Sequence, residues 1–341
     1  MTQTSRREPL VSVVTPVYNG ESHLRECIES VLAQTYQNWD YTIVNNCSTD
    51  GTLDIAMEYA ARDPRIRIHN NDAFVRVTEN HNIAFRQVSP ASTYCKLVLA
   101  DDWLFPECLA RMVRVAEEHP TVGLVGAYGL VGPRLAWIRL PYPSTVIPGR
   151  EACRIRLLEG HNFFGTATAV LFRSDIVRKR HAFWNESNLH ADSESYLEIL
   201  AHYDFGFVHQ VLTFSREREG SLTAFSHRFN TYLPGNLYEL LTFGPNCLTD
   251  EELQRKLREH IAQYYEYLGQ QIYRRRGSDF WRFHRKKMAE LGYPLSSWRL
   301  VVAGTSYVLD LALNPKSTVQ KVLNRLRRNG AGAGAHANAT G

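Results

Sequence analysis

The chain has 341 residues, of which 44% are apolar, so it is long and apolar enough to bury a substantial core. Its 6 cysteines and 13 histidines show no metal-binding or redox spacing, which predicts reduced structural thiols and a cytosol-like compartment. Residues 1–9 are polar and lead directly into an apolar run, which leaves no room for the apolar core of a signal peptide. We therefore expect an unsecreted globular protein.

The net charge of +4 is unevenly distributed. Residues 251–330 contain 16 Lys and Arg against 7 Asp and Glu, so this segment carries +9 and the rest of the chain −5. A basic segment of this kind offers a surface to anionic partners such as phospholipid head groups, nucleic acid or a lipid diphosphate. A solvated helical face explains the same charges equally well.

The first 120 residues alternate between strand and helix patterns. The β-branched run 11–19 predicts a buried strand, which Pro16 and the Asn19-Gly20 turn close. Apolar residues then recur every three or four positions over 21–34, which is typical of an amphipathic helix. The alternation continues with a strand at 41–44, a helix at 53–62, a strand at 66–69, a helix at 80–88, a strand at 96–100 and a helix at 107–119. It implies a mostly parallel, doubly wound α/β sheet.

The second half of the chain is less regular. We expect strands at 122–130, 167–172 and 205–214, helices at 151–158 and 190–201, and a Pro- and Gly-rich loop at 131–149. From about residue 236 only helical patterns remain, at 251–275, 280–291 and 298–313, and the last is too short to cross a bilayer. This divides the chain into an α/β domain at 1–235, a basic helical extension at 236–329 and a disordered tail at 330–341.

Two adjacent acids, Asp101 and Asp102, end the apolar run at 96–100. Carboxylates at the carboxyl end of a buried strand lie where α/β sheets bind a divalent metal ion and a phosphorylated ligand. Capping of the following helix is the alternative, and it is plausible for one of the two acids. The polar string 45–52, which follows the second predicted strand, consists of turn and helix-cap residues.

Three motifs in this order resemble those of glycosyltransferase family 2, the inverting nucleotide-sugar transferases with the GT-A fold. They are VSVVTPVYNG at 11–20, IVNNCSTDGT at 43–52 and LADDWLFPE at 99–107. The resemblance covers roughly residues 9–225. It implies a GT-A type, mostly parallel, Rossmann-like sheet and a nucleotide-sugar donor of the UDP or dTDP type.

The resemblance assigns the nucleotide to the first two motifs. Pro16 and Tyr18 match nucleotide-binding positions, where Tyr18 would stack on the base ring. Asn46 matches the second acid of the family's usual Asp-Asp pair, which contacts the base edge. Both acids are Asn here, and an amide still supplies a donor and an acceptor. A packed turn for Tyr18, and turn formation by Asn45 and Asn46, are the structural alternatives.

The acidic motif implies the metal ion. Asp101, assisted by Asp102 directly or through water, would ligate Mg²⁺ or Mn²⁺, which neutralises the charge on the departing nucleoside diphosphate. The family commonly has another acid two positions before Asp101, where this chain has Leu99. One carboxylate, two phosphate oxygens and waters still complete the coordination shell.

The catalytic base is implied by the sequence ADSE at 191–194. Asp192 matches the second acid of a pair in the family, and it would take the proton from the acceptor hydroxyl. Ala191 stands where the family usually has Glu. Glu194 is the alternative base, and helix capping is the structural alternative for Asp192.

Two further segments resemble family motifs. Asn162–Thr166 (NFFGT) resembles the acceptor-side loop, whose glycine lets a ligand approach the backbone. Arg216 or Arg218 would touch the diphosphate. Ion pairing with Glu217 and Glu219 explains these two arginines equally well.

These observations predict a metal-dependent, non-processive enzyme that adds one sugar to a hydroxyl of a glycan or lipid-linked acceptor. We expect it to be cytoplasmic, to touch the inner face of the membrane through its basic C-terminal segment, and not to bind nucleic acid. A nucleotidyltransferase is one rival, but 18–22 lacks the basic phosphate loop expected of it. A catalytically inactive nucleotide- or carbohydrate-binding protein is the other, which Leu99, Ala191 and the Asn pair favour.

Overall fold

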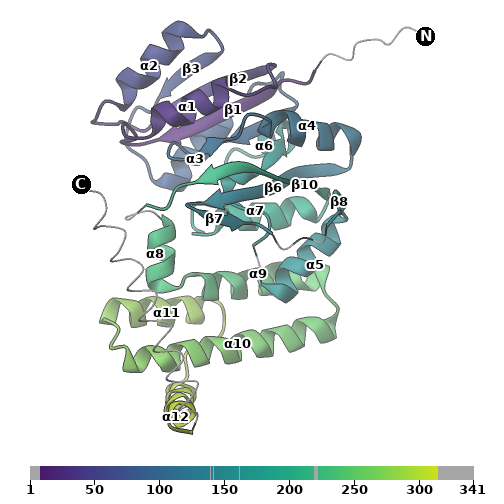
Figure 1. Ribbon diagram of the computed structural model, residues 1–341. Helices are drawn as coiled ribbons and strands as arrows, with labels where there is room; N and C mark the ends of the chain where they lie inside the picture. The colour runs from purple at the N-terminus through teal and green to yellow at the C-terminus, as the bar shows by residue number, and fades with distance from the viewer. Residues whose placement is uncertain (1–7, 139, 141, 161, 219–221, 314–341) are drawn as a thin grey trace, which may run out of the picture. The chain divides into compact units, whose positions relative to one another are not determined.

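A computed structural model describes residues 8–138, 140, 142–160, 162–218 and 222–313 (Figure 1). The chain divides into two compact units. The first comprises the described residues of Met1–Thr231 together with Glu239–Leu253, and the second those of Tyr232–Tyr238 together with Gln254–Gly341. The predicted boundary at 235/236 therefore falls inside helix α9 (Tyr232–Cys247), where the two units alternate. The predicted tail at 330–341 lies outside the described residues.

The described part of the first unit is built on one sheet with the order β3-β2-β1-β4-β9-β6-β10-β5, to which β7 and β8 add at β6 and β10. β1 pairs in parallel with β2 and β4, β2 with β3, and β6 with β10. The strands are β1 (Val11–Val17), β2 (Trp39–Asn45), β3 (Ile66–Asn70), β4 (Tyr94–Leu97), β5 (Trp103–Leu104), β6 (Val122–Val131), β7 (Arg134–Ala136), β8 (Val146–Ile147), β9 (Leu171–Arg173) and β10 (Asp204–Ser215). The predicted mostly parallel α/β sheet is confirmed.

Helices flank this sheet (Figure 1). All seven residues of β1 are buried, as expected for a central parallel strand that is covered on both faces. The helices of this unit are α1 (Leu24–Leu32), α2 (Thr52–Arg62), α3 (Val77–Arg86), α4 (Cys108–Glu118), α5 (Gly149–Glu159), α6 (Ser174–Arg178), α7 (Ala191–Leu200) and α8 (Leu222–Phe229), with parts of α9 and α10.

Two predicted strands are corrected. The strand predicted at 96–100 is β4 and ends at Leu97, because the backbone then turns and Leu99 N donates to Thr168 Oγ1 at 3.1 Å. The strand predicted at 167–172 begins as a short 3-10 helix (Ala167–Ala169), and only β9 follows, antiparallel to β4 and β6. The turn at Thr168 holds its hydroxyl against both Leu99 and Asp102.

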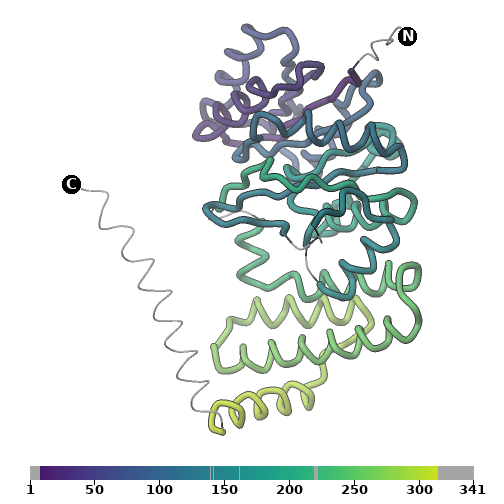
Figure 2. Tube along the Cα trace, turned by 45° about the vertical axis from the view of Figure 1, so that its right-hand side comes forward, coloured from purple at the N-terminus to yellow at the C-terminus, as the bar shows by residue number. Residues whose placement is uncertain are grey.

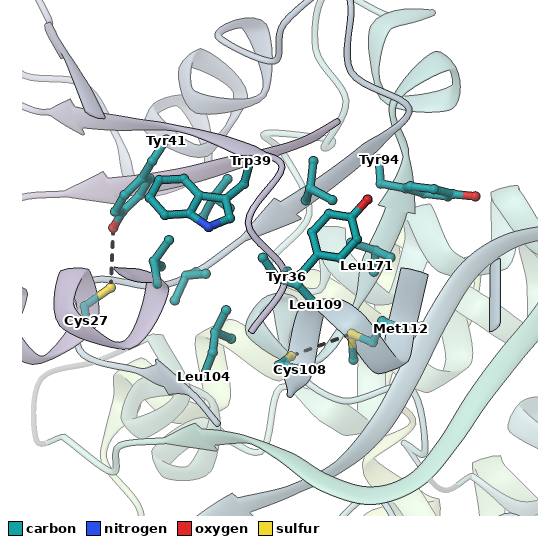
Figure 3. Close-up of a cluster of buried hydrophobic side chains, with 14 of the residues drawn as sticks. Cys27, Tyr36, Trp39, Tyr41, Tyr94, Leu104, Cys108, Leu109, Met112 and Leu171 are labelled. Carbon is teal, nitrogen blue, oxygen red and sulfur yellow. Dashed lines mark hydrogen bonds between the residues drawn. The ribbon is translucent and has the colours of Figure 1, made fainter. Parts of the chain in front are cut away.

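Aromatic and sulfur-containing side chains fill the core below β1 and β2 (Figure 3). The buried hydroxyl of Tyr41 lies 2.8 Å from Thr15 Oγ1 and 3.7 Å from Cys27 Sγ, so it has polar partners away from water. Lys96 in β4 is also fully buried, and its Nζ lies 3.5 Å from Met112 Sδ. Burial lowers the pKa of Lys96, because the interior disfavours its charged form.

The second unit is helical in its described part. It contains most of α10 (Asp250–Tyr273), together with α11 (Ser278–Glu290) and α12 (Ser297–Leu313), which are drawn in light green to yellow in Figure 2. Tyr264 of α10 lies 2.7 Å through its hydroxyl from Nδ1 of the buried His284 of α11, which joins these two helices. Among the described helices, none has the length and apolarity needed to cross a bilayer.

Candidate functional site

The carboxyl ends of β1, β2 and β4 bring the first predicted residues to one edge of the sheet. Val17 pairs with Asn45 of β2, so Tyr18 and Asn46 are the next residues along both strands. Val14 pairs with Leu97 of β4, and Tyr18 and Asp101 each lie four positions beyond this pair. The parallel register therefore delivers the three predicted positions to the same edge.

Tyr18 is half-exposed at this edge, with 47% of its surface accessible. Its ring centroid lies 4.8 Å from that of Phe74, which is 60% exposed, at an interplanar angle of 62°. Sequence reasoning missed Phe74, although a lone aromatic residue just after the polar segment 70–72 was a usable signal. Two exposed rings at the end of a parallel sheet provide an apolar platform for a flat ligand.

Asn46 is buried and holds the loop that carries Phe74. Its Nδ2 donates to Val75 O at 2.9 Å, and its Oδ1 accepts from Val75 N at 3.0 Å and from Asn71 Nδ2 at 2.9 Å. The amide thus makes the turn contacts that the structural alternative describes, and a contact with a base stays a prediction. Pro16 is buried in β1 opposite Val44, and its contact with a nucleotide also stays a prediction.

Asp101 remains partly accessible, with 18% of its side chain exposed. Its Oδ2 lies 2.9 Å from Nε of Arg218, and its backbone oxygen accepts from Nε of Arg216 at 3.3 Å. Arg216 also pairs with Glu26 at 2.6 Å, and Glu217 pairs with Arg134. The two predicted arginines therefore lie at the acidic motif.

Asp102 is buried, with 3% of its surface exposed. Its Oδ2 accepts from the hydroxyls of Thr168 at 2.6 Å and Ser215 at 3.1 Å, and its Oδ1 accepts from Arg216 N at 3.0 Å. Burial raises the pKa of Asp102 to about 7, although these donors oppose the shift. Asp102 thus ties the acidic motif to the 3-10 helix and to the end of β10, and its predicted contact with a metal ion is untested.

Asp192 lies in the first turn of α7, where the sequence predicts it. Its Oδ1 accepts from Ser193 N at 2.8 Å, and burial raises its pKa, which the charge of His190 partly offsets. Ser193 donates to Glu239 Oε1 at 2.7 Å, and Glu239 forms a buried ion pair with Arg156, also at 2.7 Å. This pair fixes the start of α7, and sequence reasoning missed it because its members lie 83 positions apart.

Contacts connect α7 to α3. Burial lowers the pKa of His81 on α3. The rings of His81 and Trp184 are 5.0 Å apart, and Trp184 Nε1 donates to Ser195 Oγ at 3.1 Å. Ser195 in turn donates to the backbone oxygen of Asp192 at 2.7 Å.

A cavity of about 660 Å³ opens between α3, the segment before α7 and one face of α7. Glu194, the alternative base, faces it and accepts hydrogen bonds from Asn185 at 3.2 Å and Asn188 at 2.8 Å. Trp184 adds an aromatic wall. Aromatic, amide and carboxylate groups around one cavity can together bind a polyhydroxylated ligand. Its lining also includes Glu79, Arg86, Arg180, Phe183, Glu186, Ser195 and Glu198.

The described residues offer few protein ligands for a metal ion near Asp101. Among the described residues, no three His, Cys, Asp or Glu side chains converge as a metal site. The donor set fits a hard cation only where a bound diphosphate supplies further oxygens beside Asp101.

Comparison with known proteins identifies the domain. Residues 12–180 match the family model described as glycosyl transferase family 2. This chain belongs to glycosyltransferase family 2. The family 2 chain is 33% identical over 153 residues to the putative glycosyltransferase EpsE of Bacillus subtilis. The aligned segment covers 42% of this chain and 54% of EpsE. It therefore spans about half the length of that relative.

Solved structures show the same fold. The family 2 chain superposes on Staphylococcus aureus TarS 1–349 in complex with UDP-GlcNAc with a TM-score of 0.57 and 17% identity, over 75% of this chain and 73% of TarS. The mannosyltransferase PcManGT of Pyrobaculum calidifontis, in complex with GDP-Man and Mn²⁺, gives a TM-score of 0.55 and 15% identity, over 93% of this chain and 84% of PcManGT. The GT-A fold is thereby confirmed.

Proposed function

We propose that this chain is an inverting, metal-dependent, non-processive glycosyltransferase that moves one sugar from a UDP- or dTDP-type donor to a hydroxyl of a glycan or lipid-linked acceptor. The observation that carries this proposal is the delivery of the Tyr18–Phe74 platform and of Asp101 to one edge of a parallel sheet. Family membership and the nucleotide-sugar complexes of TarS and PcManGT support it.

In this proposal the platform binds the base of the donor, and the acidic motif binds its diphosphate. Tyr18 would stack on the base with Phe74 beside it, and Asp101, assisted by Asp102, would hold Mg²⁺ or Mn²⁺ at the diphosphate. The cation supplies a Lewis acid for the departing nucleoside diphosphate. Arg218, which pairs with Asp101, would exchange this carboxylate for a phosphate oxygen of the donor as its ion-pair partner.

Asp192 takes the proton of the acceptor hydroxyl while that oxygen attacks the anomeric carbon opposite the leaving phosphate. One such displacement inverts the anomeric configuration. Burial raises the pKa of Asp192, which makes its carboxylate a stronger base than an exposed aspartate. The cavity beside α7 is lined by Trp184 and Glu194 and not by Asp192, so a sugar bound in it would meet Glu194, the alternative base, first.

Titration calorimetry with UDP, with and without Mn²⁺, tests the proposal. The wild-type protein should bind UDP more tightly with Mn²⁺, and Asp101→Ala should lose this metal-dependent gain. Asp54→Ala, on the exposed side of α2, is the matched control and should behave as wild type. Donor hydrolysis across a panel of nucleotide-sugars then names the sugar. If neither wild type nor control bound UDP, the proposal would be wrong.

A nucleotide-binding protein without transferase activity is the second candidate, because the internal pairing of Asp101 with Arg218 favours it. It predicts UDP binding that is indifferent to Mn²⁺ and to Asp101→Ala. No donor hydrolysis would accompany that binding.

A further inference from the structure

Helix α12 in the second unit packs through one face against α10. Gly269 of α10 permits this close approach, because a Cβ there would lie 2.7 Å from the carbonyl carbon of Ala303. The rings of Tyr273 and Tyr307 are 6.0 Å apart on the same side. Gly304 is the one buried residue of α12 among the described residues, and Arg299 adds a contact with α10 by lying over the ring of Tyr265, 4.7 Å from its centroid.

Large apolar side chains are exposed on α12, beside the exposed Arg299, Thr305 and Asp310 of the same helix. Its large side chains recur at spacings of three, four and six positions, so they form a stripe along one side of the helix. Globular proteins rarely leave such a contiguous apolar stripe in water, and an exposed stripe marks an interaction surface. Its members, with their exposed fractions, are Trp298 (73%), Val301 (56%), Val302 (45%), Val308 (41%), Leu309 (53%) and Leu313 (76%).

Cations lie on both sides of this stripe in the sequence. The end of α10, which contacts α12 through Tyr273, exposes Ile272 and is followed by the exposed Arg274 and Arg275. After α12 the sequence 314–329 contains five Lys and Arg and no Asp or Glu. An apolar stripe with a tryptophan, bordered by arginine and lysine, has the composition of helices that lie in the head-group region of anionic membranes.

We propose that the α12 stripe, Trp298 to Leu313, binds the surface of a bilayer that contains anionic phospholipid. The apolar side chains enter the boundary between head groups and acyl chains, and the neighbouring cations face lipid phosphates. An anionic bilayer is favoured over a second copy of the chain, because a dimer through this stripe would bring the cations of the two copies together. This binding is independent of the transferase reaction.

Vesicle cosedimentation of the full chain tests the proposal. Wild type should bind vesicles of phosphatidylcholine mixed with phosphatidylglycerol, bind pure phosphatidylcholine more weakly, and lose affinity as salt is raised. The double variant Trp298→Ser with Leu309→Ser should lose binding by on the order of tenfold or more, because two large apolar groups no longer enter the bilayer. Met57→Ser, which removes a comparably exposed side chain (49%) from α2, should bind as wild type.

Two further measurements keep the outcomes distinct. The double variant should fold as wild type does, because both replaced side chains are exposed. Circular dichroism and light scattering check this. A second full-length variant, Arg274→Gln with Arg275→Gln, should weaken binding and flatten its salt dependence. The proposal is overturned if the double variant binds mixed vesicles as wild type does. It is also overturned if wild type is a dimer that this variant dissociates without changing vesicle binding.

Discussion

Nε of Arg218 lies 2.9 Å from Oδ2 of Asp101, so the carboxylate that we propose for the metal ion is already paired with a cation of its own chain. Arg218 is half-exposed, and such surface pairs contribute little. Arg218→Gln should therefore raise the affinity of the nucleotide-free protein for Mn²⁺ by roughly twofold to fivefold, and lower the affinity for UDP with Mn²⁺. Calorimetry measures both. Arg134→Gln, which breaks the neighbouring pair with Glu217, is the control, and equal Mn²⁺ binding in all three proteins would contradict the competition.

Asp192 should set the acid limb of the pH–rate profile. Burial raises its pKa above the ordinary value of 3.8, and a general base works only when it is deprotonated. Turnover should therefore rise with pH through this raised pKa and then level off. Asp192→Asn should retain UDP binding and lose turnover by several orders of magnitude, roughly 10²–10⁴-fold. Glu194→Gln is the control for the alternative base, and near-normal turnover in Asp192→Asn would remove Asp192 from this role.

Restoring the family's acid at position 46 should loosen the loop that carries Phe74. In Asn46→Asp the donor to Val75 O is lost and a carboxylate oxygen faces that carbonyl, while Val75 N and Asn71 keep an acceptor. We expect a loss of about 1–3 kcal/mol of stability and faster amide hydrogen exchange at Val75. Asn38→Asp, whose side chain bonds Glu8 O at the surface, should leave Val75 unchanged. Undiminished protection of Val75 in Asn46→Asp would show that the contact is dispensable.

Replacing the buried Lys96 should stabilise the protein. Burial lowers the pKa of Lys96 below its ordinary 10.5, so between these two values the unfolded chain binds the extra proton and stability rises with pH. Lys96→Met removes the cost of burying the amine and should raise the free energy of unfolding at pH 7 by about 1–4 kcal/mol. It should also flatten the alkaline rise, as urea titrations at pH 7 and 9 would record. Lys179→Met, at an exposed position, should change stability by about 0.5 kcal/mol or less, and destabilisation by Lys96→Met would contradict the argument.

Local patterns predicted the alternating elements and the sheet edge at which Tyr18 and Asp101 both lie. Both follow from short-range periodicity and from the rule that parallel strands end on one side. The family resemblance made Asp101 the metal ligand, with Asp102 assisting it directly or through water. The structure gives them opposite surroundings, because Thr168 and Ser215 enclose the second acid from positions 66 and 113 residues away.

Other parts of the candidate site depend on contacts of the same long range. The Arg156–Glu239 ion pair behind α7 joins two helices that no local motif connects. The 3-10 turn at Thr168 replaces a strand that β-propensity favours, since its hydroxyl must meet Leu99 and Asp102. Side-chain environments of this kind are set by tertiary packing, which overrides local propensity.

The six cysteines differ in their burial, and the exception lies at the edge of the sheet. Five are buried, whereas Cys47, the residue after Asn46, is only half-buried and donates to Asn71 O at 3.3 Å. A small maleimide should therefore modify this thiol first, and the residue that it contacts, Asn71, lies three positions before Phe74. The protein thus carries a native labelling handle beside its base platform, from which a fluorophore can report nucleotide arrival without an engineered cysteine.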